Sequence, residues 1–592
     1  MISYRFNNGF DLCGTMSVVM QKQVMAHLGE GASGVMFSID PTTGTDTAIL
    51  MQGIFGLGEP LVGGRAEGDT FYAFKPGIRN MKNAIIGEKI GSKNIKTVIN
   101  NNRKLGEPFT IDTELAESMQ RKLCLNQSEV VQLAQWATVI EDHFGFNVDI
   151  EWAKDGITGE LFIVQARPET VESQRDTTAL NIYKIDSEES SLNKLLEGSA
   201  ANSLIGSGQV QKINSPNDVD LFTKGNVLVV DETNPDWEPM MKKAGAILTK
   251  KGSKTCHAAI IAREMGIPCI VGCTNIETLE DGREITVDCS KGDIGYVYGG
   301  LIPFSVTKIP INDIPQTDVK IMVNMANPEE SFGNAKVPND GIGLLRSEFL
   351  AARFGIHPNA LVYFDELDTQ TQSEVLVKLG LDIPNNESEK ELLRTKLKEV
   401  YVRQHALGLA KIATAVWPNP AVTRLSDFKS NEYRNLLGGR FFEPEEKNPM
   451  MGVRGAARYY HPKYTEAFKW ECEAVKYARD EIGLTNIIPM IPMCRTPIEG
   501  RKVLEIMKAY GLERGVNDLK VYVMAEIPAN CLEAEEFAEI FDGFSIGSND
   551  LTQFTLAIDR EETILASIGD AANPSVIKLI IPPPLKTSDN LT

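Results

Sequence analysis

One histidine stands where its ring could accept and pass on a phosphoryl group. His257 follows a Lys-Gly-Ser turn and opens an apolar, helix-like run that reaches Arg263. Imidazole is a good nucleophile near neutral pH, and the free amides at a helix N-terminus can hold anionic oxygens. The same spacing also fits a capped helix with a histidine that does no chemistry, so this stretch alone leaves both interpretations open.

Four polar residues on two strand-like runs form a second candidate site. Asp149 and Glu151 alternate on the first run, and Gln165 and Arg167 alternate on the second. Because alternate strand residues share a face, paired strands would bring all four together. Oxygen ligands suit Mg²⁺, and a guanidinium offers a planar fork for phosphate oxygens. An exposed polar strand edge is the alternative.

Polar residues also follow the strand-like runs of the C-terminal region. These runs recur with helical segments between them, which predicts repeated βα units and a TIM barrel. In such a barrel the strand ends form the active site. Surface salt bridges would explain any one of these residues, but not all of them together. The strand ends read Arg346-Ser347-Glu348, Arg424-Leu425-Ser426-Asp427, Met524-Ala525-Glu526 and Ser548-Asn549-Asp550.

Length and composition limit the class of protein. The chain has 592 residues and a formal charge of −20, from 80 acidic and 60 basic residues. The length predicts three or so domains, and the charge disfavours nonspecific binding to nucleic acid or anionic membranes. Nine scattered cysteines suggest reduced thiols. With no long apolar run and no signal-peptide pattern, we expect a cytoplasmic enzyme.

The order of local patterns indicates further elements. Strands are expected over residues 17–21, 34–39 and 47–52, before a glycine-rich loop. The charged stretch 171–200 is interpreted as a linker that contains a helix. Short β-branched runs between residues 225 and 287 alternate with turns and helices, which predicts an α/β module.

The stretch from Gly252 to Arg263 resembles the phosphohistidine signature of the phosphoenolpyruvate (PEP)-utilising enzymes. The cysteine before the histidine, Cys256, resembles the residue found at this position in the PEP synthases (pyruvate, water dikinases), whereas pyruvate phosphate dikinases usually have serine there. The resemblance runs from about residue 2 to about residue 580 in the family's order. It implies a phosphotransferase that converts pyruvate, ATP and water to PEP, AMP and phosphate through phosphorylated His257, at the entry to gluconeogenesis.

The resemblance also implies roles for the polar clusters. Positions matching Glu151, Gln165 and Arg167 face the nucleotide phosphates and metal in the family, with Asp149 nearby. In the C-terminal region, several arginines would hold the anionic substrates, and Mg²⁺ would stabilise the pyruvate enolate. The matched substrate-binding residues are Arg346, Arg424, Arg454 and Asn549, with Arg560 as a further candidate, and the matched Mg²⁺ ligands are Glu526 and Asp550.

The implied fold is a multidomain α/β chain. Because the resemblance begins inside the ATP-grasp domain and ends before the family's Cys-Gly motif, we expect a chain that is truncated at both ends and impaired on its own. The expected domains are a partial ATP-grasp (pyruvate phosphate dikinase-type AMP/ATP-binding) domain over 1–175, a linker over 176–199, a swivelling phosphohistidine β/α domain over 200–300, a linker over 301–316, a PEP/pyruvate-binding TIM (β/α)8 barrel lacking its last units over 317–581, and an atypical tail over 582–592.

Three functions remain open from the sequence. The first is a PEP synthase with ATP as substrate and Mg²⁺ as cofactor. The second is an inactive phosphocarrier or partner fragment, and the third is a related pyruvate phosphate dikinase. Expected ligands are pyruvate or PEP and ATP, without nucleic acid or membrane. A homo-oligomer is a further expectation, as is a regulatory kinase/phosphorylase acting on Thr255, which matches a threonine phosphorylated in bacterial relatives.

Overall fold

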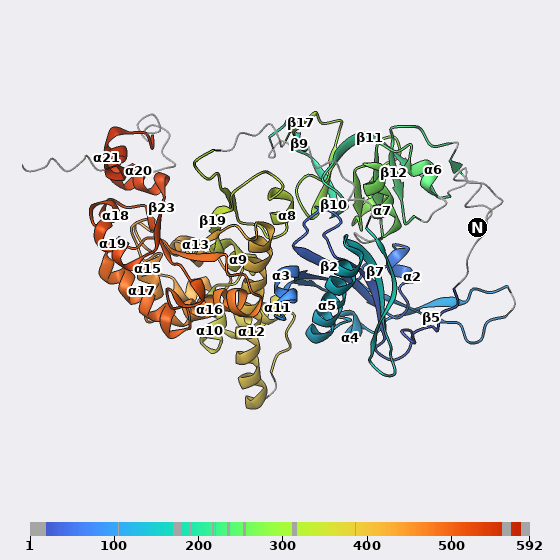
Figure 1. The fold of residues 1–592 in the computed structure, drawn as a ribbon, viewed down its shortest axis with the longest axis horizontal. Helices are drawn as coiled ribbons and strands as arrows, with labels where there is room; N and C mark the ends of the chain where they lie inside the picture. Colours follow the sequence, from blue (N-terminus) through green and yellow to red (C-terminus); the bar gives the residue numbers. More distant parts are fainter. Residues whose placement is uncertain are drawn as a thin grey trace, which may run out of the picture.

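Three units follow one another along the chain, each built around its own sheet: an N-terminal unit (32–168), a middle unit (194–299) and a C-terminal unit (323–580). In the computed structural model the N-terminal unit, blue to teal, lies against the middle unit, green, and beside the C-terminal unit, yellow to red (Figure 1). The structure describes residues 19–104, 106–169, 179–188, 192–215, 218–219, 221–233, 237–252, 256–310, 317–384, 386–558 and 570–581.

The N-terminal unit is a six-stranded antiparallel sheet in the order β4-β3-β2-β1-β7-β8, with α5 packed on it. A capping box at Asn126 starts α5 and Gly145, with a φ of +75°, ends it. Residues 19–21, expected as part of a strand, are irregular. The elements are β1 (Ala32–Phe37), β2 (Ala48–Phe55), α2 (Glu59–Val62), β3 (Asp69–Phe74), α3 (Lys75–Arg79), β4 (Ile85–Lys89), β5 (Ile95–Ile99), β6 (Thr110–Glu114), α4 (Glu117–Gln120), α5 (Gln127–Phe144), β7 (Val148–Lys154) and β8 (Leu161–Pro168).

The middle unit is a closed barrel in the order β10-β14-β13-β12-β11-β15-β16. Alternate residues of its strands fill two cores, because successive side chains point to opposite faces: Val227 and Val229 lie in one, Leu228 and Val230 in the other, beneath the helices. The elements are β10 (Lys194–Ala200), β11 (Ile205–Lys212), β12 (Val227–Val230), α6 (Glu238–Met241), β13 (Ala246–Thr249), α7 (His257–Met265), β14 (Cys269–Val271), β15 (Glu284–Asp288) and β16 (Ile294–Gly299).

The two segments that connect the middle unit to its neighbours pair with each other. Strand β9 (Ala179–Ile185) runs antiparallel to β17 (Phe304–Pro310), with Ile185 opposite Phe304. The helix expected within 171–200 is wrong for the described residues, which form strands β9 and β10 there. The local charge pattern favoured a helix, but a partner strand more than a hundred residues away decides the structure.

The C-terminal unit has six parallel strands in chain order, β18-β19-β20-β21-β22-β23, as in consecutive strands of a (β/α)8 barrel. The strands are β18 (Val323–Met325), β19 (Ile342–Arg346), β20 (Ala421–Arg424), β21 (Ile487–Ile491), β22 (Tyr522–Ala525) and β23 (Gly543–Ile546). The helices are α8 (Ser331–Asn334), α9 (Ser347–Arg353), α10 (Pro358–Val362), α11 (Thr369–Leu379), α12 (Glu387–Ala415), α13 (Ser430–Arg434), α14 (Gly439–Phe442), α15 (Ala456–Tyr459), α16 (Thr465–Lys476), α17 (Pro497–Ala509), α18 (Pro528–Leu532), α19 (Ala534–Ile540), α20 (Ser548–Leu556) and α21 (Pro574–Ile580).

The N-terminal and C-terminal units share one hydrophobic core, whereas the middle unit has cores of its own. The Phe74 ring meets the Trp417 ring edge-on at 5.2 Å between centroids, and Thr47 donates to the Thr414 carbonyl at 3.1 Å. These two units therefore form one body, which we call the frame, and the middle unit lies against it.

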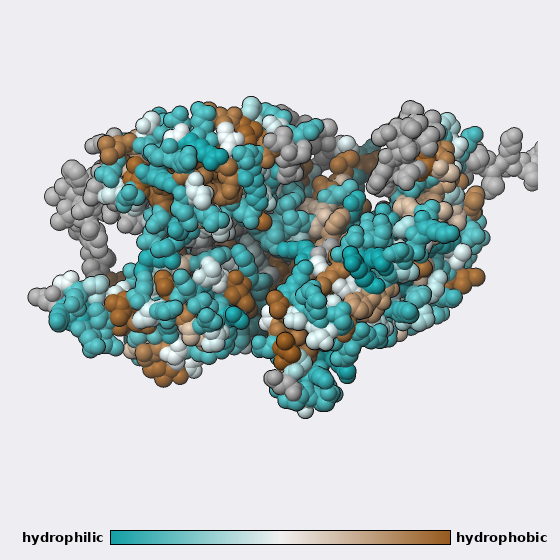
Figure 2. Space-filling view, turned by 180° about the vertical axis from the view of Figure 1, so that it is seen from behind, coloured by the Kyte–Doolittle hydropathy of each residue, from teal (hydrophilic) through white to brown (hydrophobic). Residues whose placement is uncertain are grey.

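The surface agrees with the acidic composition. Seen from behind, hydrophilic residues cover most of the face and hydrophobic ones gather in small groups (Figure 2). Over the described part of the chain, no helix is long and apolar enough to cross a membrane.

Candidate active site

The four polar residues on β7 and β8 lie together. Asp149 pairs with Arg167 and Glu151 pairs with Gln165 across the two antiparallel strands. The Arg167 Nε donates to the Asp149 carboxylate at 2.7 Å, and the Arg167 side chain is about half exposed. Glu151 is half-buried and Gln165 is exposed. Cross-strand partners share a face, so the sheet edge presents a guanidinium beside oxygen ligands.

Helix α7 has the bounds that the sequence predicts. It begins at His257, after Cys256 in extended conformation, and ends before Gly266, whose φ is +65°. Glycine adopts this left-handed conformation without strain, so it stops the helix. The His257 side chain lies outside the described part of the structure, as does residue Thr255.

The start of α7 lies against the N-terminal unit. A Cβ built on Gly64, in the loop after α2, would be 3.2 Å from the Cβ of Cys256. Burial raises the pKa of Asp149, while Arg167 opposes that rise and Arg263, on α7, does so as well. The start of the helix that carries His257 therefore packs against the N-terminal unit.

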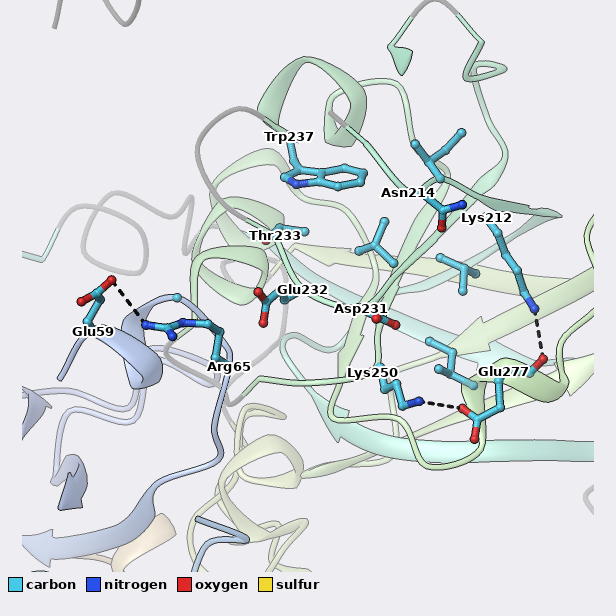
Figure 3. Close-up of a pocket in the computed structure, with 15 residues that line it drawn as sticks. Glu59, Arg65, Lys212, Asn214, Asp231, Glu232, Thr233, Trp237, Lys250 and Glu277 are labelled. Atoms are coloured by element: carbon cyan, nitrogen blue, oxygen red, sulfur yellow. Dashed lines mark hydrogen bonds and ion pairs between the residues drawn. The ribbon is translucent and has the colours of Figure 1, made fainter. Parts of the chain in front are cut away.

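A pocket opens where the N-terminal and middle units meet. It encloses about 650 Å³ and is lined from the N-terminal side by Glu59 and Arg65. On the middle-unit side, Trp237 and Thr233 line the pocket (Figure 3), as do Val229 and Val230 of β12. The cationic side chains are engaged locally, since Arg65 pairs with Glu59 at 3.3 Å and Lys250 pairs with Glu277 at 3.4 Å. The junction thus leaves a small-molecule-sized space.

In the C-terminal unit, two arginines converge on one buried aspartate. Arg454 makes a two-pronged contact with Asp427, with Nε–Oδ1 at 3.0 Å and a second nitrogen 2.5 Å from Oδ2. Arg424, at the end of β20, lies 3.5 Å from Asp427 and also pairs with Glu348. Burial disfavours the charge of Arg424, but Glu348 and Asp427 outweigh it and raise its pKa. Both guanidiniums are held charged at the strand ends.

Two carboxyl groups lie beside these arginines. Glu526 follows β22 and is fully buried; its Oε1 accepts from the Met493 amide at 2.6 Å, while Oε2 has no hydrogen-bond partner. Asp550 lies in the first turn of α20, with an oxygen 3.6 Å from Arg454. Burial, together with the charges of Asp427 and Asp550, raises the pKa of Glu526 to about 8.

This arrangement fits a divalent cation. No three described His, Cys, Asp or Glu residues gather as a metal site. Mg²⁺, however, is commonly held by one or two carboxylates while water and substrate oxygens complete its shell. Such an ion would give the unpartnered Oε2 of Glu526 a partner. It would also offset the negative charge of the carboxylates around Glu526.

The remaining expected substrate residues lie at the same strand ends with more exposure. Arg346 ends β19 directly beside Arg424 in register and lies 5.9 Å from the centre of the Phe349 ring. Asn549 is exposed at the start of α20. Arg560 falls outside the described residues.

Sequence reasoning assigned no role to Glu471, a buried acid behind this site. Its Oε1 accepts from the Ser347 hydroxyl at 2.6 Å, the Ser426 amide at 2.9 Å and the Ser426 hydroxyl at 3.0 Å. It therefore ties the ends of β19 and β20 together from α16. The sequence carried a signal for the burial of Glu471, because apolar Ala467 and Val475 stand four residues before and after it, on the same helix face.

Comparison with family models assigns each unit. The pyruvate phosphate dikinase AMP/ATP-binding domain matches residues 1–189, the mobile domain of PEP-utilising enzymes matches residues 222–292, and their PEP-binding domain matches residues 305–582. The histidine-bearing helix lies within the match to the mobile domain, and together the matches define the class of PEP-utilising phosphotransferases.

Curated relatives narrow the class. A PEP synthase of Synechocystis sp. is 47% identical over 588 residues, covering 98% of this chain and 70% of that protein. PEP synthases of Aquifex aeolicus and Escherichia coli are 44% and 43% identical, again over 98% of this chain, and 72% and 71% of their own lengths are covered. The chain belongs to the phosphoenolpyruvate synthase family.

Proposed function

We propose that this chain forms PEP from pyruvate, ATP and water, with AMP and phosphate as the other products. One observation carries the proposal: the start of the helix that begins at His257 packs against Gly64 of the N-terminal unit, while the Arg424–Arg454 site lies in the C-terminal part of the same frame. A mobile histidine between two fixed sites is what a two-stage phosphoryl transfer needs.

In the first stage, ATP and water give AMP, phosphate and phosphorylated His257. We assign binding of the nucleotide phosphates to Arg167, with Glu151 and Gln165 as oxygen ligands for a cation. Asp149 holds the Arg167 guanidinium in place through the 2.7 Å contact. A fixed guanidinium offsets charge on the phosphoryl oxygens during transfer.

In the second stage, the enol oxygen of pyruvate attacks the phosphorus of phosphohistidine. That enol oxygen forms because the methyl group first gives a proton to water. As the O–P bond forms, the P–N bond breaks, its electron pair returns to the imidazole and His257 is regenerated. Arg424, Arg454 and Arg346 would bind the carboxylate and phosphoryl groups, with Asn549 and Arg560 as further contacts. Glu526 and Asp550 would hold Mg²⁺, which when bound supplies Lewis-acid stabilisation of the enolate.

The finer domain assignment belongs to the same proposal. The antiparallel sheet would be part of an ATP-grasp domain, the closed barrel the swivelling phosphohistidine domain, and the six parallel strands part of a TIM barrel. We also propose Thr255, two residues before His257, as a regulatory phosphorylation site.

A labelling experiment tests the function. The chain is incubated with PEP that carries a radioactive phosphoryl group, and the label is located by peptide mapping. We expect acid-labile label on His257, none in His257→Asn, and undiminished label in His461→Asn, which alters an exposed histidine elsewhere. Label that survives His257→Asn would refute the assignment. With ATP and pyruvate, release of phosphate rather than pyrophosphate would distinguish a water dikinase from a phosphate dikinase.

A further inference from the structure

The described residues show two places where the middle unit meets the frame. On one side Gly64 packs against Cys256, just before His257. On the other side, the turn between β15 and β16 meets the C-terminal unit: a Cβ built on Gly292 would lie 2.8 Å from Cγ and 3.0 Å from Cα of Glu330. Both contacts must separate before α7 can leave the N-terminal unit.

A buried lysine joins all three units at the second contact. Lys411, on α12, has a side chain only 8% exposed. Its Nζ lies 2.7 Å from the Glu329 carboxylate of the C-terminal unit and 3.1 Å from the Asp293 carboxylate of the middle unit. The same nitrogen lies 4.7 Å from the centre of the Tyr72 ring, on β3 of the N-terminal unit.

The charges at this junction depend on Lys411. Asp293 and Glu329 approach the same nitrogen from different units, so without it two carboxylates would face each other across the contact. Burial alone would lower the pKa of Lys411, but Asp293 and Glu329 outweigh burial and raise it, so the amine stays charged. Glu329 has a second partner in Arg353 at 3.0 Å, within the C-terminal unit.

We propose that Lys411 is a positioning residue whose ion pair with Asp293 seats the middle unit where the start of α7 packs against the N-terminal unit. The pair forms in the ATP-facing position and breaks each time the middle unit leaves for the PEP-facing site. The inference rests on the proposed function for its kinetic consequence, but the seating itself is a property of the structure.

A distance measurement tests the seating without activity. Spin labels are placed at Leu221→Cys on the middle unit and Val377→Cys on the C-terminal unit, positions that are 69% and 77% exposed. Cys13 and the partly exposed Cys531 are changed to serine, and the other cysteines are buried. We expect one narrow distance distribution in the parent and a broadened or shifted one in Asp293→Asn, which leaves the Lys411–Glu329 pair intact.

Two further variants make the result decisive. Glu284→Gln removes an exposed acid from β15 of the same unit and should match the parent. Lys411→Met should broaden the distribution at least as much as Asp293→Asn, because it also leaves the Asp293 and Glu329 carboxylates facing each other. The double variant should be no worse than Lys411→Met, because both changes remove the same Lys411–Asp293 pair. Identical distributions in the parent and Asp293→Asn would overturn the proposal, as would fully additive effects.

The kinetic consequence separates positioning from a general structural role. In Asp293→Asn we expect labelling of His257 from ATP to slow by about tenfold, the effect of about 1.4 kcal/mol, while labelling from PEP is unchanged or faster. Equal slowing of both would mean a merely structural role and would overturn the proposal. If the parent is labelled by neither substrate, the proposed function fails, and the distance measurement still decides the seating.

Discussion

The buried acid behind the arginine site gives a prediction with a defined pH dependence. Burial raises the pKa of Glu471 to about 7 from an ordinary value of 4.5, although hydrogen bonds from Ser347 and Ser426 oppose the rise. The folded chain therefore keeps a proton on Glu471 at pH values where the unfolded chain has released it. Stability consequently falls as the pH rises from about 4.5 to about 7 and then levels off.

The size of the effect follows from that gap. At about 1.4 kcal/mol for each pH unit, the full loss is about 3 kcal/mol. Much of it falls near the isoelectric pH of about 5.0, where low net charge favours precipitation. Between about pH 6 and about pH 8, about 1 kcal/mol remains to be measured.

The change to make is Glu471→Gln. A glutamine carbonyl oxygen can accept the same three hydrogen bonds as Oε1, but it carries no titrating proton. We expect the parent to lose about 1 kcal/mol more unfolding free energy than this variant between about pH 6 and about pH 8. Glu471→Ala should be less stable at every pH, because the serine donors lose their acceptor.

Urea unfolding followed by tryptophan fluorescence supplies the measurement, with midpoint and slope recorded at each pH. Parallel pH profiles for the parent and Glu471→Gln would refute the reasoning, since they would mean that Glu471 titrates alike in both states. Glu473→Gln on the same helix is the matched control: Glu473 pairs with Lys398 near the surface, at 2.8 Å, and its profile should follow the parent's.

Two further perturbations test the N-terminal unit and its contact with α7. Lys93→Met removes the partner of Asp69 from a fully buried ion pair; it should cost about 3–5 kcal/mol of unfolding free energy, and a loss below about 1 kcal/mol in urea unfolding would contradict this. Gly64→Ala places a methyl group against Cys256 at a φ of +75° and should slow ATP-driven labelling of His257 about fivefold, as about 1 kcal/mol would. Gly145→Ala has the same φ and no neighbour within 4 Å, so equal slowing in both would argue against the docking contact.

Local sequence signals were sufficient for elements whose determinants lie close together in the chain. The helix that starts at His257 could be predicted because its start, its apolar run and its terminal Gly266 fall within ten residues. The pairing of Asp149 with Arg167 followed from two strands separated by a short turn. Hydrophobic periodicity and the residue types found in turns are sufficient to predict such elements.

Long-range partners account for what sequence reasoning missed. Glu471 and Ser347 are 124 positions apart, and Lys411 and Asp293 are 118 apart. A lone lysine within a helix is usually solvated, so Lys411 does not signal its burial. The apolar neighbours of Glu471 on its helix face indicate burial but do not indicate its distant partners. The strand β9 was missed for the same reason, since its partner β17 lies beyond the whole middle unit.

The pairing of β9 with β17 restricts the range of positions that the middle unit, and His257 with it, can reach. The two segments that connect the middle unit to its neighbours pair as one two-stranded sheet. The unit is therefore tethered at a single edge and not by two independent linkers. A tethered reactant samples a small volume and reaches its target at a high effective concentration. Phosphorylated His257 would then meet pyruvate far more often than free phosphohistidine in solution could.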